Sequence, residues 1–362
     1  MQIKKKINNL NRLYIIFFSS VLFINIVLCT TLNANSFKIT DLEISEPFVL
    51  NFNKEEVIDK GFKKAFSELV STITTSDDKK KIKDVKLSTI KNLIDSFTMS
   101  NERFIKNIYK VNFDVSFNIK NTLSFFEKKN IFPSIPIQKK LLLIPVFVNL
   151  QSDQIQLFDK NIFYEQWNKK NKRYYLLNYI LPSEDLEDIN LILQNSESIE
   201  DYSFDRTIKK YDLEDYVIVI IYKNKNELRV LSKMQLNQSF KINNTKFKNV
   251  NFNENEDIDL VLERLKTIYE NYWKEINQIN TSIKLPITIS VNSNKHKKIK
   301  IFENILDQLI LVSNYEIVKF DSKKIYYKVV YNGPPDKFFE NIKEKNLIAE
   351  NINQIWEIKW KI

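Results

Sequence analysis

The sequence predicts an α+β protein built from several small αβ domains, the last of which is ferredoxin-like. The apolar residues recur with period two in some segments and at three-and-four spacing in others, which is typical of strands and helices in one chain. The chain has 362 residues, and this is more than one hydrophobic core usually holds. With 43% hydrophobic and 28% charged residues, its composition is that of a packed protein.

The N-terminal segment, residues 1–36, predicts export. It begins with basic residues, continues with a mostly apolar stretch over residues 13–32 and ends in the small residues Ala34-Asn35-Ser36. This order is typical of a signal peptide cleaved before Phe37, which places the protein in the periplasm. An uncleaved anchor in the inner membrane is the alternative, and it would be the chain's only membrane contact. Cys29, the single cysteine, lies within this segment.

The first domain is predicted over residues 37–132. An extended stretch at 37–50 leads to a helix, because Asn53 and Glu56 have capping-box spacing and the apolar residues up to Ile73 share one face. The segment 109–119 alternates apolar and polar residues without error, which predicts a half-buried strand. The remaining predictions are a polar, lysine-rich break at 74–84 and helices at 87–94 and 122–129.

Pro133 and Pro136 indicate a boundary, and a middle domain is predicted over residues 138–280. Residues 141–148 are apolar on both faces, like a strand inside a sheet, although Pro145 requires an edge or a bulge there. The other elements expected in this domain are a short helix near Trp167, a strand at 174–181, an acidic helix start at 183–188, a helix at 198–211, strands at 215–222 and 227–235, and a long helix at 258–276.

The C-terminal domain is predicted over residues 281–362. Apolar periodicity indicates a strand at 283–291, a helix at 299–310, strands at 315–320 and 325–331, a helix at 335–345 and a last strand at 356–362. This order of strand, helix, strand, strand, helix, strand is the ferredoxin-like split motif. The motif predicts no activity by itself.

Taken together, the mature chain resembles a family of exported proteobacterial proteins known only as a domain of unknown function, number two thousand and sixty-six. The resemblance is carried by the patterns of the helix 56–71, the strand 109–119 with its following helix, Leu142-Leu143-Ile144-Pro145-Val146 with Trp167, Leu181-Pro182 with Asp185 and Asp188, Tyr211 before the strand 216–221, and Tyr331-Asn332-Gly333. Most of the family's glycines, alanines and arginines are replaced here by Asn, Lys and Ile. The resemblance implies a periplasmic envelope protein without an assigned activity.

Several function classes are disfavoured by composition. The formal net charge is +10, but four of the 55 basic residues and none of the 45 acidic ones lie in residues 1–36, which leaves +6. The run at 79–83 is interpreted as a solvated loop, so no nucleic-acid partner is expected. One histidine, His296, and two glycines disfavour histidine-based catalysis, a transition-metal site and a phosphate-binding loop. No cofactor and no metal are predicted.

Two groups of residues stay open as sites. Glu184, Asp185, Glu187 and Asp188 have the residue types for acid–base chemistry or calcium binding, or they complement the dipole of a helix start. Aromatic residues around a short helix, with Phe163 among them, form either an interaction surface or part of a core, and the candidates for that surface are Phe158, Tyr164 and Trp167.

The leading functional hypothesis is therefore a non-enzymatic envelope protein that binds another envelope protein or the cell wall. It depends on the predicted export, on the small αβ domains and on the lack of a catalytic pattern. The alternatives are a periplasmic enzyme that uses carboxylates and the same body tethered by an uncleaved anchor. The sequence leaves the ligand, the partner and the oligomeric state open.

Overall fold

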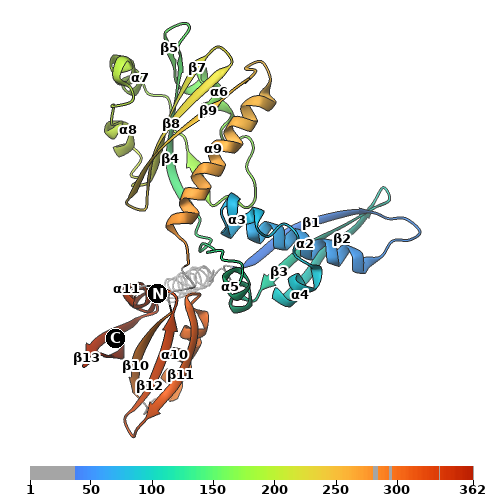
Figure 1. The fold of residues 1–362 in the computed structure, drawn as a ribbon, viewed down its shortest axis with the longest axis vertical. Helices are drawn as coiled ribbons and strands as arrows, with labels where there is room; N and C mark the ends of the chain where they lie inside the picture. The colour runs from blue at the N-terminus through green and yellow to red at the C-terminus, as the bar shows by residue number, and fades with distance from the viewer. Residues whose placement is uncertain (1–36, 280–283, 293–295, 334, 362) are drawn as a thin grey trace, which may run out of the picture.

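The structure, a computed structural model, describes residues 37–279, 284–292, 296–333 and 335–361. The predicted signal peptide therefore lies outside the described residues. Helices and strands are mixed throughout, as the predicted α+β class requires, and the strands form three separate sheets. Figure 1 shows one sheet in each of three lobes, which we call the N-terminal lobe (37–132), the middle lobe (138–279) and the C-terminal lobe (284–361). Among the described residues, no helix is long and apolar enough to cross a membrane.

The N-terminal lobe is a three-stranded antiparallel sheet with helices against one face. The strands β1 (Lys38–Pro47), β2 (Ile94–Ile105) and β3 (Ile108–Phe117) lie in the order β1-β3-β2. The long helix α2 (Lys54–Ile73) packs on the sheet, and α4 (Leu87–Leu93) and α5 (Ile119–Glu127) complete the core. The predicted cap is present, because the Asn53 side chain accepts a hydrogen bond from the Glu55 amide at 2.9 Å.

Two elements of this lobe were not predicted. The strand β2 has no buried residue along its length, so its sequence carries no alternation to detect. The predicted polar break contains the short helix α3 (Ser76–Lys80), whose cap Thr75 accepts a hydrogen bond from the Asp78 amide at 3.3 Å. Neither element presents an apolar face of its own, which is the signal that sequence reasoning needs.

The middle lobe is a six-stranded mixed sheet covered on both faces. Its path is β5 (Gln154–Gln156), β4 (Lys139–Asn149), β7 (Tyr216–Asn224), β8 (Glu227–Leu236) and β9 (Ser239–Phe247), and β6 (Leu177–Ile180) also pairs with β4. One face packs against α6 (Ile162–Gln166) and the long helix α9 (Asn255–Ile276). The other face packs against η1 (Phe158–Lys160), α7 (Leu186–Gln194), η2 (Ser196–Ser198) and α8 (Asp205–Lys209).

Pro145 occupies a gap on one edge of β4, as its missing amide donor requires. On one side, β4 pairs in parallel register with β7, and Pro145 lies opposite Val219. On the other side, β6 pairs with residues 139–142 and β5 with residues 147–149, so Pro145 falls between them. The Asn161 side chain fills this position by donating to the Pro145 carbonyl oxygen at 3.0 Å. The predicted edge is confirmed.

The middle lobe also differs from expectation in several places, and the short strand β5 is one element that was not predicted. The strand β9 was missed because it is a sheet edge with exposed or half-buried residues only. The predicted helix 198–211 is shorter, since only the five residues of α8 are helical there and η2 ends at Ser198. The segment between the N-terminal and middle lobes was predicted as a domain boundary, and it is packed: Ser134 is buried and forms an isolated antiparallel bridge with Gln278.

The C-terminal lobe follows the predicted order of elements, with one additional strand before the last. It contains β10 (Leu285–Asn292), α10 (His296–Gln308), β11 (Val312–Phe320), β12 (Lys324–Tyr331), α11 (Pro335–Glu344), β13 (Leu347–Ile352) and β14 (Ile355–Trp360). The sheet order is β11-β12-β10-β14-β13, and β14 runs parallel to β10. The split motif has one strand after its second helix, whereas a hairpin of two strands stands here. The C-terminal lobe therefore resembles the ferredoxin-like motif in the order of its elements.

Candidate functional site

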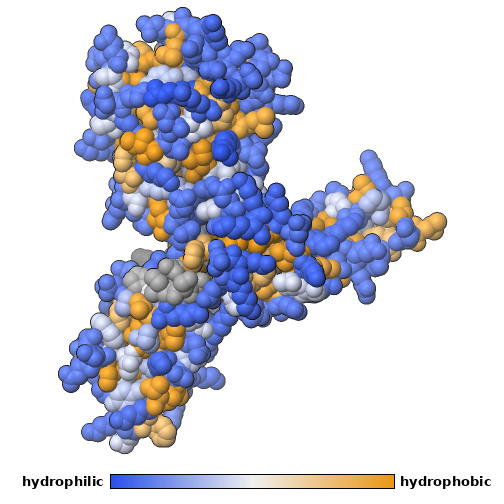
Figure 2. Space-filling model, in the orientation of Figure 1, coloured by the Kyte–Doolittle hydropathy of each residue, from blue (hydrophilic) through white to orange (hydrophobic). Residues whose placement is uncertain are grey.

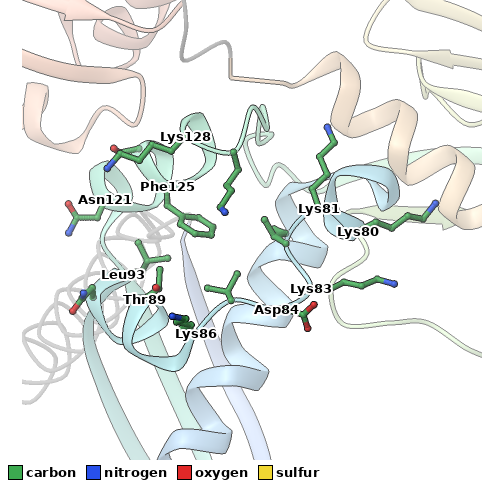
Figure 3. Close-up of a pocket in the computed structure, with 15 residues that line it drawn as sticks. Lys80, Lys81, Lys83, Asp84, Lys86, Thr89, Leu93, Asn121, Phe125 and Lys128 are labelled. Carbon is green, nitrogen blue, oxygen red and sulfur yellow. The ribbon is translucent and has the colours of Figure 1, made fainter.

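A cavity of about 770 Å³ lies in the N-terminal lobe between the α3–α4 connection and α5 (Figure 3). Its apolar lining consists of Ile82, Val85, Leu93 and Phe125, of which Ile82 and Leu93 are buried in the core. Figure 3 shows the Phe125 ring pointing into the cavity. Six lysines lie around this apolar lining: Lys80, Lys81, Lys83, Lys86, Lys128 and Lys129.

Local sequence explains how these lysines come to surround one space. Thr75 caps α3, and the buried side chain of Ile82 then holds the following turn against the core. The cap Asn118 starts α5 by accepting a hydrogen bond from the Asn121 amide at 3.0 Å. The Phe125 ring lies 5.9 Å from the Phe66 ring of α2, which fixes α5 opposite the turn. Lysines far apart in the chain are therefore held on the two sides of the cavity.

The charge of the cavity is only partly compensated within the chain. Lys80 pairs with Asp77 at 2.7 Å and Lys81 with Asp78 at 2.6 Å, and the hydrogen bond from Lys80 lowers the pKa of Asp77. In the described part of the chain, the other four lysines have no carboxylate within ion-pair distance: Lys83, Lys86, Lys128 and Lys129. Asp84 is the one acidic residue of the lining. The cavity therefore suits an anionic group that is joined to an apolar one.

The predicted acidic cluster has structural partners. Asp185 caps α7, because its carboxylate accepts hydrogen bonds from the Glu187 and Asp188 amides at 2.8 and 3.2 Å. These amides, and the hydrogen bond from Lys210, lower the pKa of Asp185. Asp188 is buried and pairs with Lys210 at 2.9 Å. A general acid at neutral pH needs a raised pKa. The lowered pKa of Asp185 is the opposite of this requirement.

Two further acids of this cluster lie at the surface of the middle lobe. Glu187 forms an ion pair with Arg206 of α8, and Glu184 is exposed. Across the described residues, no group of three or more His, Cys, Asp or Glu side chains is placed to hold a metal ion. The contacts match helix capping and the docking of α8 on α7, the structural alternative for these residues.

The predicted aromatic surface is divided between the two faces of the middle sheet. Trp167 is fully buried on the α9 face, with its ring stacked on the Tyr269 ring at 6.2 Å and edge-on to the Tyr179 ring at 5.6 Å. Phe158 and Tyr164 pack on the opposite face, with ring centroids 5.7 Å apart. The three residues do not form one accessible surface. Their contacts are those of the core-packing alternative.

The lysine-lined cavity was missed by sequence reasoning, which treated residues 79–83 as a solvated loop. The available signal was the density of lysines between residues 79 and 86 without a matching density of acids. The second half of the cavity comes from Lys128 and Lys129 at the end of α5, and the packing of α5 brings them there. No local pattern joins these two segments.

No protein-family model matches the chain, and no curated protein matches it. The resemblance to the exported family of unknown function therefore stays a prediction.

Proposed function

We propose that this chain is an exported envelope protein that acts as a non-enzymatic binding module and receives an anionic segment of another protein in its lysine-lined cavity. The observation that carries the proposal is the set of four lysines without carboxylate partners around an apolar lining. A peptide segment that combines acidic side chains with one apolar or aromatic side chain offers complementary groups to both parts of the cavity.

The shape of the site favours such a segment over a nucleic acid. An extended polyanion is bound by a basic face that follows its backbone, with many phosphate contacts. Here the lysines are gathered around one cavity of about 770 Å³, and the phenyl ring of Phe125 points into it. A short acidic segment with an anchoring side chain fits this arrangement.

Charge reversal at the cavity tests the binding site. We expect the double variant Lys83→Glu/Lys128→Glu to weaken binding of a fluorescent peptide containing Asp, Glu and one Phe by about tenfold or more, because two attractive charges become repulsive. Fluorescence anisotropy at two salt concentrations measures the affinity and its electrostatic part. Lys225→Glu/Lys248→Glu is the matched control, since both lysines are exposed in the middle lobe.

The control should bind as the unchanged chain does. Equal affinity of the unchanged chain and the cavity variant, or no salt dependence, would contradict the proposed site. The proposed location has its own test, which is the intact mass of the protein recovered from the cell envelope. A mass that begins at Phe37 supports a cleaved signal peptide, a mass that begins at Met1 supports the anchored alternative, and recovery from the cytoplasm contradicts export.

A further inference from the structure

The far end of the N-terminal lobe carries a compact group of exposed apolar side chains, distant from the lysine-lined cavity. It is formed by the loop after β1 and by the β2–β3 hairpin, which lie together where the lobe projects furthest from the rest of the molecule (Figure 1). We call this group the apolar tip. Leu50 is fully exposed, and the six members are Phe48, Val49, Leu50, Phe104, Ile105 and Ile108. Figure 2 shows hydrophobic surface at this projecting end.

The apolar tip is held in place by specific contacts. The Phe48 amide donates to the Asn107 carbonyl oxygen at 2.8 Å, which joins the loop to the hairpin. The Phe48 ring lies 4.9 Å from the rings of both Phe52 and Phe104. The Phe104 ring in turn lies 5.1 Å from the ring of Tyr109, which is buried in the core. The tip is therefore an ordered projection that keeps its apolar side chains in water.

The backbone groups at this end are largely paired within the chain. Besides the Phe48 amide, the Phe52 amide donates to the Val49 carbonyl oxygen at 2.8 Å, and Ile105 pairs with Ile108 across the hairpin. A surface that enters an apolar medium must satisfy its backbone donors and acceptors internally, since unpaired groups cost several kcal/mol each in hydrocarbon. The Phe48 and Phe52 amides and the pair Ile105–Ile108 meet this requirement.

Most charged side chains near the apolar tip are paired within the chain. Residues 48–53 are uncharged, and the hairpin turn carries the exposed cation Lys106, which has no ion-pair partner in the described part of the chain. The nearby carboxylates are already paired: Glu102 with Lys54 at 3.0 Å, Glu46 with Lys60 at 2.5 Å, and Glu43 with Arg103 at 3.4 Å. The tip thus presents apolar side chains and one free positive charge.

From these observations we infer that the apolar tip inserts into the boundary between headgroups and acyl chains of a bilayer that contains anionic phospholipid. Because a bilayer is flat, the projecting tip contacts it before the other lobes do. Contact with a protein would instead require a partner that has a matching cavity. The apolar side chains gain by leaving water, and the long side chain of Lys106 extends back to the phosphate layer. This site is distinct from the lysine-lined cavity, so the two proposals can fail separately.

A local fluorescent probe tests the insertion in the mature chain, residues 37–362, which lacks the apolar stretch of the predicted signal peptide. An environment-sensitive dye is attached at Asn51→Cys, the one cysteine of this chain, and the protein is mixed with vesicles of phosphatidylcholine with or without phosphatidylglycerol. Because Asn51 lies within the loop beside Leu50, we expect a blue shift and quenching by brominated acyl chains, stronger with the anionic lipid. The same dye at Leu260→Cys, an exposed position on α9, should keep its emission in water.

A matched pair of substitutions then separates the tip from the rest of the chain. With the dye at Asn51→Cys, Leu50→Ser should reduce the fraction of quenched dye at a fixed lipid concentration, and the apparent partition should fall roughly tenfold. Ile317→Ser, on the exposed edge of β11, should leave the partition unchanged. The inference is overturned if the emission of the dye at position 51 stays at its value in water with both kinds of vesicle. It is also overturned if the emission is already blue-shifted without vesicles, which would indicate self-association through the tip.

Discussion

Buried lysines on α9 are the residues whose chemistry the fold changes most. Lys266 is almost completely buried, and its ammonium group donates to the Lys170 carbonyl oxygen and the Asn171 side chain, both at 2.8 Å. Lys274 is also buried, and it donates to the Ser71 carbonyl oxygen at 2.5 Å. Burial lowers the pKa of each lysine to about 8, because the low-dielectric surroundings penalise the charged form.

This shift predicts a specific dependence of stability on pH. The unfolded chain, with a lysine pKa near 10.5, binds more protons than the folded chain between about pH 8 and pH 10.5, so the free energy of unfolding rises with pH across this window. As the pH falls through about 8, that contribution is lost. Urea unfolding at about pH 7.5 and pH 9.5 measures the slope. Lys266→Met should reduce the slope, with Lys274 supplying the remainder, whereas Lys225→Met in an exposed turn should leave it unchanged, and equal slopes would contradict the assignment.

At the scale of single elements, α7 depends on the residue that begins it. Asp185 accepts hydrogen bonds from two amides of the first turn, and Lys210 of the neighbouring segment lies 3.2 Å from the same carboxylate. Capping requires an oxygen acceptor and tolerates Asn as well as Asp, whereas acid–base catalysis requires the carboxyl group itself. Two substitutions at one position therefore distinguish a cap from a catalytic acid.

We expect Asp185→Ala to lower the free energy of unfolding by about 1 kcal/mol, because the first-turn amides lose their acceptor. Asp185→Asn should retain most of the stability, since the amide oxygen still caps the helix and only the ion pair with Lys210 is lost. Chemical denaturation of both variants provides the measurement. If the Asn variant is destabilised as much as the Ala variant, the carboxylate charge matters more than the cap, contrary to this account.

At the scale of the whole molecule, polar contacts join the N-terminal lobe to the middle lobe. The Asn271 side chain of α9 accepts from the Ser76 amide at 2.9 Å and donates to the Ser76 hydroxyl at the same distance. Lys274 of α9 and Lys79 of α3 both donate to Ser71 at the end of α2. Arg173 reaches Glu68 of α2 at 3.2 Å. These contacts hold the base of the lobe that bears the lysine-lined cavity and the apolar tip.

Removing one of these contacts should loosen the junction without unfolding either lobe. In Asn271→Ala, hydrogen exchange of the Ser76 amide should be about tenfold faster, since the loss of one hydrogen bond is worth about 1 kcal/mol. Amides in β7, at the centre of the middle sheet, should keep their protection. Asn178→Ala, on the exposed side of β6, serves as the control. Unchanged exchange at Ser76 would show that this contact does not hold the lobes together.

The sequence by itself determined the elements whose burial follows a local apolar pattern. The strand β3 and the helices α2 and α9 follow from their apolar periodicity, and the inner strands β4 and β7 follow from continuous apolar runs. The α+β class and a place for Pro145 at a strand edge followed in the same way. The strands β2 and β9 could not be predicted, since exposed edge strands carry no alternation.

Only the tertiary structure decided where distant residues meet. It placed Trp167 on one face of a sheet and Phe158 with Tyr164 on the other, although all three lie within ten residues of each other in the chain. It also brought Lys128 and Lys83 to the same cavity, and Phe104 against Phe48. The physical reason is that periodicity reports whether a side chain is buried, whereas its partner is set by the summed packing of whole elements, which no local stretch of sequence contains.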